Sequence, residues 1–229
     1  MKTQKNSLLK FAAVGTCCFG VLMPASAKAE TVDLRYTGTA NVVATEVKIP
    51  VQASPISVYM GTYNIEQQTP ANSFLAYCSD PFQYSNNVFQ SYFVKTPLSM
   101  QITDPGRLSD VNALFSHAYA NSLTTATKAA GFQLAMWEMW HDDKNLGFGL
   151  VQATSNTVLA VRNEAQSLLD QLSLNSWSLP ASAYQVTVYT NDSYQDYVTA
   201  APVPEPETYA LMLVGLGLLG SVVARRRNV

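Results

Sequence analysis

The hydrophobic pattern of the chain changes twice and divides a folded region into three parts. Short runs rich in β-branched and aromatic residues, separated by Gly and Pro, predict strands at residues 32–36, 41–49, 56–63, 74–78 and 90–95. From residue 105 apolar residues recur three and four apart, which predicts helices over about 105–118, 124–140 and 156–172. A last strand is expected at 185–190. This order predicts an α+β fold, a β-rich domain with a three-helix insert.

The N-terminal residues have the pattern of a secretory signal peptide, which would form a signal helix. Lys2, Lys5 and Lys10 precede an apolar run over residues 11–23. Small residues at Ala27 and Ala29 offer two cleavage sites, and the second leaves residue 30 as the first mature residue. An uncleaved anchor is the weaker alternative, because the run is shorter than the roughly 20 residues that a membrane span needs.

The C-terminal end predicts a single transmembrane sorting helix. Residues 208–224 are uncharged, and a basic cluster follows at once, formed by Arg225, Arg226 and Arg227. The positive-inside rule keeps these arginines in the cytoplasm and places the preceding chain outside. At 17 residues the run is at the lower limit for spanning, which suits a transient sorting handle as well as a permanent anchor.

The segment before this run completes a known pattern. It reads Val203, Pro204, Glu205 and Pro206, and the apolar run contains Gly215 and Gly217. Together with the terminal arginines it resembles the PEP-CTERM sorting signal of Gram-negative bacteria that make exopolysaccharide, a tail also described as the ice-binding-protein C-terminal type. The resemblance implies anchoring in the inner membrane, processing by an exosortase, and delivery to the cell envelope or extracellular matrix.

Three segments therefore follow: a signal peptide at 1–29, an ectodomain at 30–202 and a sorting segment at 203–229. The ectodomain has 173 residues, enough for one domain with a sizeable core. It carries 14 acidic and 7 basic residues, a net charge of −7, although the whole chain is only −2. Because nucleic-acid binding depends on basic residues that neutralise phosphates, this balance predicts no nucleic-acid partner.

Cysteine usage singles out one residue. Cys17 and Cys18 leave with the signal peptide, so Cys78 is the only cysteine of the mature domain and cannot form an intrachain disulfide. A lone cysteine in an oxidising compartment is an inert buried residue, an intermolecular partner or a chemically committed group. The sequence around it favours the last of these alternatives.

Two segments indicate a committed group. The first is Phe-Leu-Ala-Tyr-Cys-Ser-Asp at 74–80, and the second is Gly-Phe-Gln-Leu-Ala-Met-Trp at 131–137. They resemble the thioester domains of bacterial surface adhesins, and a Gln-Asp pair at 195–196 resembles a later element of such domains. The resemblance implies that Cys78 and Gln133 form an internal thioester that bonds to an amine or hydroxyl on a surface, matrix or exopolysaccharide partner. Phe132 stands where the adhesins usually have Thr or Gln.

The residues support the same pair chemically. A thiolate is the nucleophile, but a carboxamide is a poor electrophile, so the fold must hold the sulfur against the side-chain carbonyl. Such positioning supplies an effective molarity of roughly 10⁵ to 10⁸ M. We therefore expect the Cys78 sulfur to contact the Gln133 carbonyl inside an aromatic enclosure that excludes water. No cofactor and no enzymatic activity are expected.

Several alternatives remain open on the sequence. A buried, unreactive Cys78 in a structural or polysaccharide-associated matrix protein is one, and a hydrolase using Cys78, His141 and Asp142 is another. His141, Asp142 and Asp143 could suggest a metal, but their place at a predicted helix end favours a cap and turn, so no metal is expected. Three tryptophans could form a sugar platform, although packing in the core is the commoner role: Trp137, Trp140 and Trp177.

Overall fold

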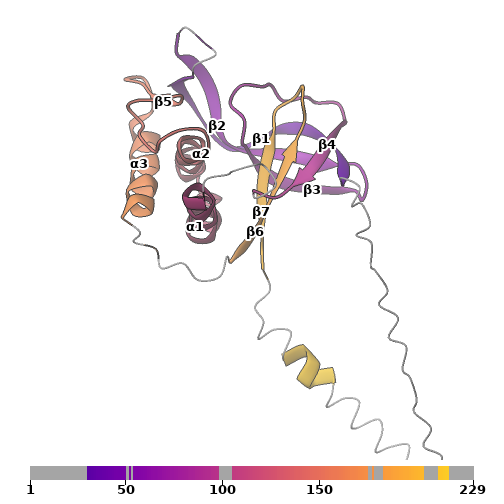
Figure 1. Ribbon diagram of the computed structural model, residues 1–229. Coiled ribbons are helices and arrows are strands. Elements are labelled where there is room, and N and C mark those ends of the chain that lie inside the picture. Colours follow the sequence, from indigo (N-terminus) through magenta and orange to yellow (C-terminus); the bar gives the residue numbers. More distant parts are fainter. Residues whose placement is uncertain are drawn as a thin grey trace, which may run out of the picture.

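The computed structural model describes residues 30–49, 52, 54–97, 105–174, 177, 183–203 and 211–216. The predicted signal peptide and most of the predicted sorting segment, including Pro204, Glu205, Pro206 and the arginine cluster, lie outside the described residues. Residues 211–216 form a short exposed helix beyond the folded domain (Figure 1). Within the described part of the chain, no helix is long and apolar enough to cross a membrane.

The β portion is a closed antiparallel barrel. Its strands are β1 (Thr31–Lys48), β2 (Ile56–Gln67), β3 (Asn72–Cys78), β4 (Gln90–Lys95), β6 (Tyr184–Thr190) and β7 (Tyr197–Pro202). They pair in the order β2-β3-β7-β6-β4-β1, and a further pairing of β1 with β2 closes the ring. The short β5 (Gln152–Ala153) adds to the end of β1. Closure removes the exposed sheet edges that would otherwise invite aggregation.

The first two predicted strands are one continuous strand in the structure. Residues 32–36 and 41–49 both belong to β1, which pairs with β2 along its length. Gly38, which lies between the two predicted runs, has a φ of +150° and sits at the first of two register shifts in this pairing. A bulge bends a strand and increases its twist without ending it, which lets β1 pair with both β2 and β4.

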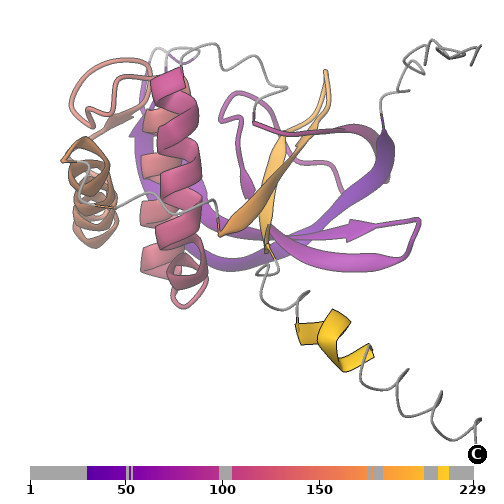
Figure 2. The same cartoon turned by 60° about the horizontal axis from the view of Figure 1, so that its bottom comes forward.

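The three helices lie together on one side of the barrel (Figures 1 and 2). They are α1 (Pro105–Ser122), α2 (Ala126–His141) and α3 (Leu159–Ser173). Helix α2 is buried from Ala129 to Trp140, as expected of a helix that contacts β1 and β2 as well as both other helices. Gly131 allows the close approach of α3, because a Cβ there would lie 2.5 Å from the Glu164 Cβ. The predicted α+β class, a β-rich domain with a three-helix insert, is confirmed.

A candidate thioester site between the barrel and helix α2

Cys78 is the last residue of β3, where it pairs with Tyr197 of β7. Its side chain is 0 % exposed, and its thiol donates to the backbone oxygen of Asp80 at 3.0 Å. Burial, and then the charge of Asp80, raise the pKa of the Cys78 thiol well above its ordinary value. The resting group is therefore a protonated thiol in an apolar enclosure.

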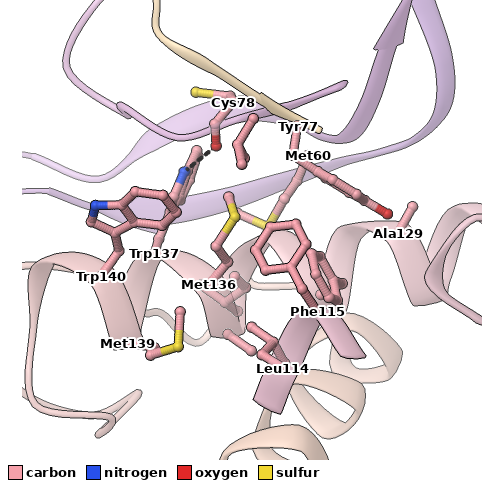
Figure 3. Close-up of a cluster of buried hydrophobic side chains, with 14 of the residues drawn as sticks. Met60, Tyr77, Cys78, Leu114, Phe115, Ala129, Met136, Trp137, Met139 and Trp140 are labelled. Carbon is pink, nitrogen blue, oxygen red and sulfur yellow. Dashed lines mark hydrogen bonds between the residues drawn. The ribbon is translucent and has the colours of Figure 1, made fainter. Parts of the chain in front are cut away.

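Helix α2 is tied to the chain at this strand end by two side chains. The Trp137 indole donates to the Cys78 carbonyl at 2.8 Å, and Figure 3 shows this carbonyl pointing at the indole while the sulfur points away from α2. One turn further on, His141 Nε2 lies 2.7 Å from the Ser79 carbonyl oxygen. The two bonds set the position of α2 against the end of β3.

Gln133 projects from the same helix and is 0 % exposed. Its Oε1 accepts the backbone N–H of Gly61 at 2.9 Å. Its Nε2 is buried and has no hydrogen-bond partner among the described residues. A buried donor without an acceptor costs about 1 to 3 kcal/mol, so this nitrogen is an expensive group for the fold to keep.

The N–H that binds Gln133 is freed by a distortion of β2. Gly61 has a φ of +138°, and a Cβ on it would lie 1.9 Å from the Asn41 carbonyl oxygen. The second register shift between β1 and β2 lies next to Gly61, between the pair Thr39–Tyr63 and the pair Val42–Gly61. Bulges are common next to functional sites because they redirect backbone groups. Here the distortion turns an N–H toward the helix.

The register also brings Gly61 close to Cys78. In the ladder between β2 and β3 the last pair is Thr62 with Tyr77, and the next residues along the two strands are Gly61 and Cys78. Gly61 and Cys78 therefore lie at neighbouring positions of adjacent strands, and the Gln133 amide oxygen accepts the N–H of Gly61. Gly61 and its bulge were not singled out as part of a site in the sequence, although a glycine within a predicted strand is a usual sign of one.

Tyr63 is a further site residue that the sequence did not reveal. Burial, and then the Cys78 thiol, raise the pKa of the Tyr63 phenol, whereas the Gln133 amide acts in the opposite direction. The phenol is therefore near both members of the pair, and its hydroxyl donates to the Tyr59 carbonyl at 2.5 Å. Nothing in the sequence distinguishes it from the other tyrosines of the domain, because its importance comes from the fold.

Both members of the predicted pair thus lie buried beside β2 and next to Tyr63. Their hydrogen bonds go to different partners, Asp80 for the sulfur and Gly61 for the amide oxygen. A direct contact between the Cys78 sulfur and the Gln133 carbonyl stays a prediction. For the sulfur to be acylated, the thiol must give up its bond to Asp80, because a thioester sulfur carries no proton.

An open pocket of about 500 Å³ adjoins the site. Tyr63 and Trp137 form part of its wall, together with residues of β1, β2 and the 81–85 segment. Tyr59 and Tyr84, which also line it, are 64 % and 84 % exposed. This volume lies within the range of ordinary ligand sites, so the pocket gives a small polar group a route to the site.

The Gln-Asp pair noted in the sequence holds the wall of this pocket in place. Gln195 Oε1 accepts the Ser85 hydroxyl at 2.5 Å, and the Asp196 carbonyl accepts the Ser79 N–H at 3.0 Å. Burial is the main cause that raises the pKa of the Asp196 carboxyl to about 6. The pair positions the segment after Cys78.

The residues of the alternative sites are placed differently. The His141 nitrogen that approaches β3 bonds to the Ser79 carbonyl, and Asp142 binds backbone N–H groups of its own loop, so the hydrogen bonds described are not those of a Cys-His-Asp triad. Trp137 and Trp140 are 2 % and 7 % exposed and cannot form a sugar platform. Trp177 stacks on His117 instead.

Comparison with known proteins supports the prediction for the C-terminal end. Residues 202–227 match the model of the PEP-CTERM protein-sorting motif. No curated protein matches the sequence.

The fold is similar to the N-terminal domain of the Streptococcus pyogenes pilus tip adhesin Cpa, at 15% identity over 72% of this chain and 98% of that chain, with a TM-score of 0.43. It is also similar to an N-terminal thioester domain of a Clostridium perfringens surface protein, studied as a cysteine-to-alanine mutant, at 12% identity over 69% and 99%, with a TM-score of 0.42. The chain carries a PEP-CTERM sorting signal, which implies an exported protein of the cell surface.

Proposed function

We propose that this surface protein forms an internal thioester between Cys78 and Gln133 and uses it for covalent adhesion. The observation that carries the proposal is the Gln133 Nε2 atom, which is buried without a hydrogen-bond partner among the described residues. This nitrogen is the atom that thioester formation expels. The reaction would remove the polar group that the fold otherwise keeps at a cost.

The step balances without an oxidant or a cofactor. The Cys78 sulfur attacks the Gln133 side-chain carbon, a carbon–sulfur bond forms, the carbon–nitrogen bond breaks, and the thiol proton leaves with the nitrogen as ammonia. The Gly61 N–H already donates to the carbonyl oxygen, where negative charge develops during the attack. The Tyr63 phenol, with its raised pKa, stays protonated beside the reacting groups.

Adhesion follows from the reactivity of the product. An amine or hydroxyl of a surface, matrix or exopolysaccharide partner attacks the thioester carbon, becomes bonded to Gln133 and releases the Cys78 thiol. Burial of Cys78 and Gln133 protects the thioester from water, and the adjoining pocket admits the partner group. Because the bond is consumed once, we propose a single-use crosslinker rather than an enzyme.

The intact mass of the exported protein tests this function. The wild-type chain should lack one ammonia relative to its sequence and should take up methylamine. Cys78→Ala and Gln133→Ala should each abolish both signals, whereas Gln166→Ala, a control on the exposed face of α3, should keep them. Methylamine uptake that survives either change at the site would place the reactive group elsewhere.

A second candidate is an unreactive structural or polysaccharide-associated matrix protein with the same fold. The thiol bond to Asp80 and the raised pKa of Cys78 favour it, since both stabilise the resting thiol. Its signature is a chain of full sequence mass that takes up no methylamine. The mass measurement therefore separates the two candidates in a single experiment.

For delivery, we propose processing by an exosortase after transient anchoring through the C-terminal apolar run, in a Gram-negative host. The matched sorting motif supports this step. Protein recovered from the envelope fraction should begin at Lys28 or Glu30 and should lack the segment after the Pro-Glu-Pro motif at 204–206. Recovery of an intact 229-residue chain from that fraction would contradict the proposal.

A further inference from the structure

A second buried polar side chain lies at the C-terminal end of α2. Glu138 is 0 % exposed, and neither of its carboxylate oxygens has a hydrogen-bond partner among the described residues. Burial, and then the charges of Asp142 and Asp143, raise the pKa of Glu138 to about 9. The nearby Asn145 N–H, which donates to Asp143, acts in the opposite direction. A carboxyl with so high a pKa is protonated near neutral pH, and it ionises there only if a cation takes the place of the proton.

The neighbours of Glu138 concentrate further negative charge. Ligand oxygens of Glu138, Asp142 and Asp143 all lie within 4.8 Å of one another. Glu138 is buried, Asp142 is half-buried and Asp143 is exposed, so the cluster runs from the interior to the surface. Three ionised acids at this spacing would repel one another, so either a proton or a cation has to lie between them.

Backbone groups hold the two aspartates in this arrangement. Asp142 Oδ2 accepts the N–H groups of Leu150 and Val151, the second at 2.9 Å. Gly149 packs on this carboxylate with a φ of +92°, and a Cβ there would lie 2.1 Å from Oδ2. Asp143 Oδ1 accepts the Asn145 N–H at 3.0 Å. The loop after α2 is thus folded around its acids.

The nearest basic side chains make other bonds. Lys144 Nζ pairs with Asp110 at 2.6 Å, and Arg107 donates to the backbone oxygens of Trp140 at 2.9 Å and Asp142 at 3.3 Å. An open pocket of about 220 Å³, lined by Arg107, Asp110, Asp142, Asp143 and Lys144, gives solvent access to the cluster.

We propose that Glu138, Asp142 and Asp143 form a site for a divalent cation of the calcium class. Oxygen ligands select hard cations, and Ca²⁺ accepts oxygens at about 2.3–2.6 Å in a flexible geometry, so two oxygens of one site can lie nearly 5 Å apart. The smaller Mg²⁺ demands a stricter octahedron. The ion would neutralise the buried carboxylate and tie the end of α2 to the 142–151 loop.

This site differs from the one weighed in the sequence. There His141 stood beside Asp142 and Asp143, and a cap and turn was preferred to a metal. In the structure the His141 imidazole bonds to the Ser79 carbonyl, and Glu138 takes its place beside the aspartates. A site without nitrogen or sulfur ligands disfavours Zn²⁺.

Thermal unfolding of the exported protein tests the proposal. The protein is purified in detergent, stripped with EDTA and titrated with CaCl₂. The wild type should gain about 3 to 6 °C in Tm at a Ca²⁺ concentration near ten times Kd. Glu138→Gln should lose this gain, yet without Ca²⁺ it should be at least as stable as the wild type, because the unpartnered acid is gone.

Asp110→Asn is the matched control. It removes one negative charge from the wall of the same pocket, but from an acid that already has Lys144 as its partner, so the gain in Tm with Ca²⁺ should remain.

Tb³⁺ binding is a second readout. Bound Tb³⁺ should give luminescence sensitised by the nearby tryptophans, and Ca²⁺ should compete with it. Asp143→Asn should weaken the affinity for Tb³⁺ at least tenfold. This readout decides the case if Glu138→Gln does not fold.

Three outcomes would overturn the site. They are a wild type whose Tm is unchanged by Ca²⁺, a Glu138→Gln chain that keeps the gain, and an Asp110→Asn chain that loses it as fully as Glu138→Gln. The last would show a general response of an acidic surface to cations.

Discussion

Helix α2 carries two buried polar side chains five residues apart, and their surroundings differ. Gln133 faces the barrel, where the Gly61 N–H binds its oxygen and Cys78 and Tyr63 are nearby. Glu138 lies near two more acids and has no hydrogen-bond partner among the described residues. The amide has an unpaired atom that can be expelled by reaction with a nucleophile, whereas the acid has no such leaving group and is neutralised by a proton or by a cation. A similar burial cost therefore suggests covalent chemistry at one position and ion binding at the other.

Replacing Gln133 by an acid, as at position 138, should have the largest effect on stability. Gln133→Glu puts an acid where the Cys78 thiol, the Tyr63 hydroxyl and the Gly61 N–H are the neighbours, and an unpaired buried charge costs roughly 3 to 5 kcal/mol. We expect chemical denaturation to show this loss near neutral pH. The ammonia-loss mass should also vanish, because no amide nitrogen remains. A variant as stable as the wild type would show that the site is wetter than its burial indicates.

The glycines beside the two positions offer a second contrast. Gly61→Ala would bring a Cβ against the backbone carbonyl of Asn41, at a residue whose φ is +138°. It should lower the free energy of unfolding by roughly 2 to 4 kcal/mol and reduce thioester formation. Gly149→Ala would meet the Asp142 side chain, which can shift more easily.

Gly149→Ala should accordingly cost less stability but weaken Ca²⁺ binding. Parallel denaturation and Ca²⁺ titration of the two variants separate the effects. Equal losses of stability would contradict the distinction between a backbone and a side-chain obstacle.

Trp137→Phe tests how the helix is held against the cysteine. It leaves the buried Cys78 carbonyl without the indole donor, which should cost about 1 to 3 kcal/mol. The fraction of chains that lack one ammonia should also fall, since α2 positions Gln133. Trp177→Phe, whose indole bonds to Gln171 on α3, is the control and should leave that fraction unchanged. A full thioester yield in Trp137→Phe would show that this bond does not position the pair.

The smallest expected effect is a pH dependence at the wall of the pocket. Because burial raises the pKa of Asp196 from 3.8 to about 6, the folded state binds more protons than the unfolded state between these values. The stabilising effect is present below about pH 4 and is lost as pH rises through about 6. Asp196→Asn keeps the side-chain oxygen that accepts the Asn191 N–H and should show a flatter profile. An identical profile in both chains would contradict the shift.

Some elements could be predicted because local pattern is enough to define them. The predicted strand at 90–95 has the bounds of β4, and the second and third predicted helices overlap α2 and α3 with starts two to three residues early. Strand β7 was missed, although it completes the barrel between β3 and β6. Its sequence ends in Ala-Ala-Pro, which has little strand propensity, so its partners on both sides decide its conformation.

The sequence by itself determined the sorting signal and the candidate pair, because both are written in residue types at fixed spacing along the chain. Only the tertiary structure decided which other residues matter. Gly61 and Tyr63 approach Gln133 across more than 65 positions, and Glu138 meets Asp142 and Asp143 only where the helix ends and the loop folds back. Burial and unsatisfied hydrogen bonds depend on what packs around an atom, and this is a property of the folded chain.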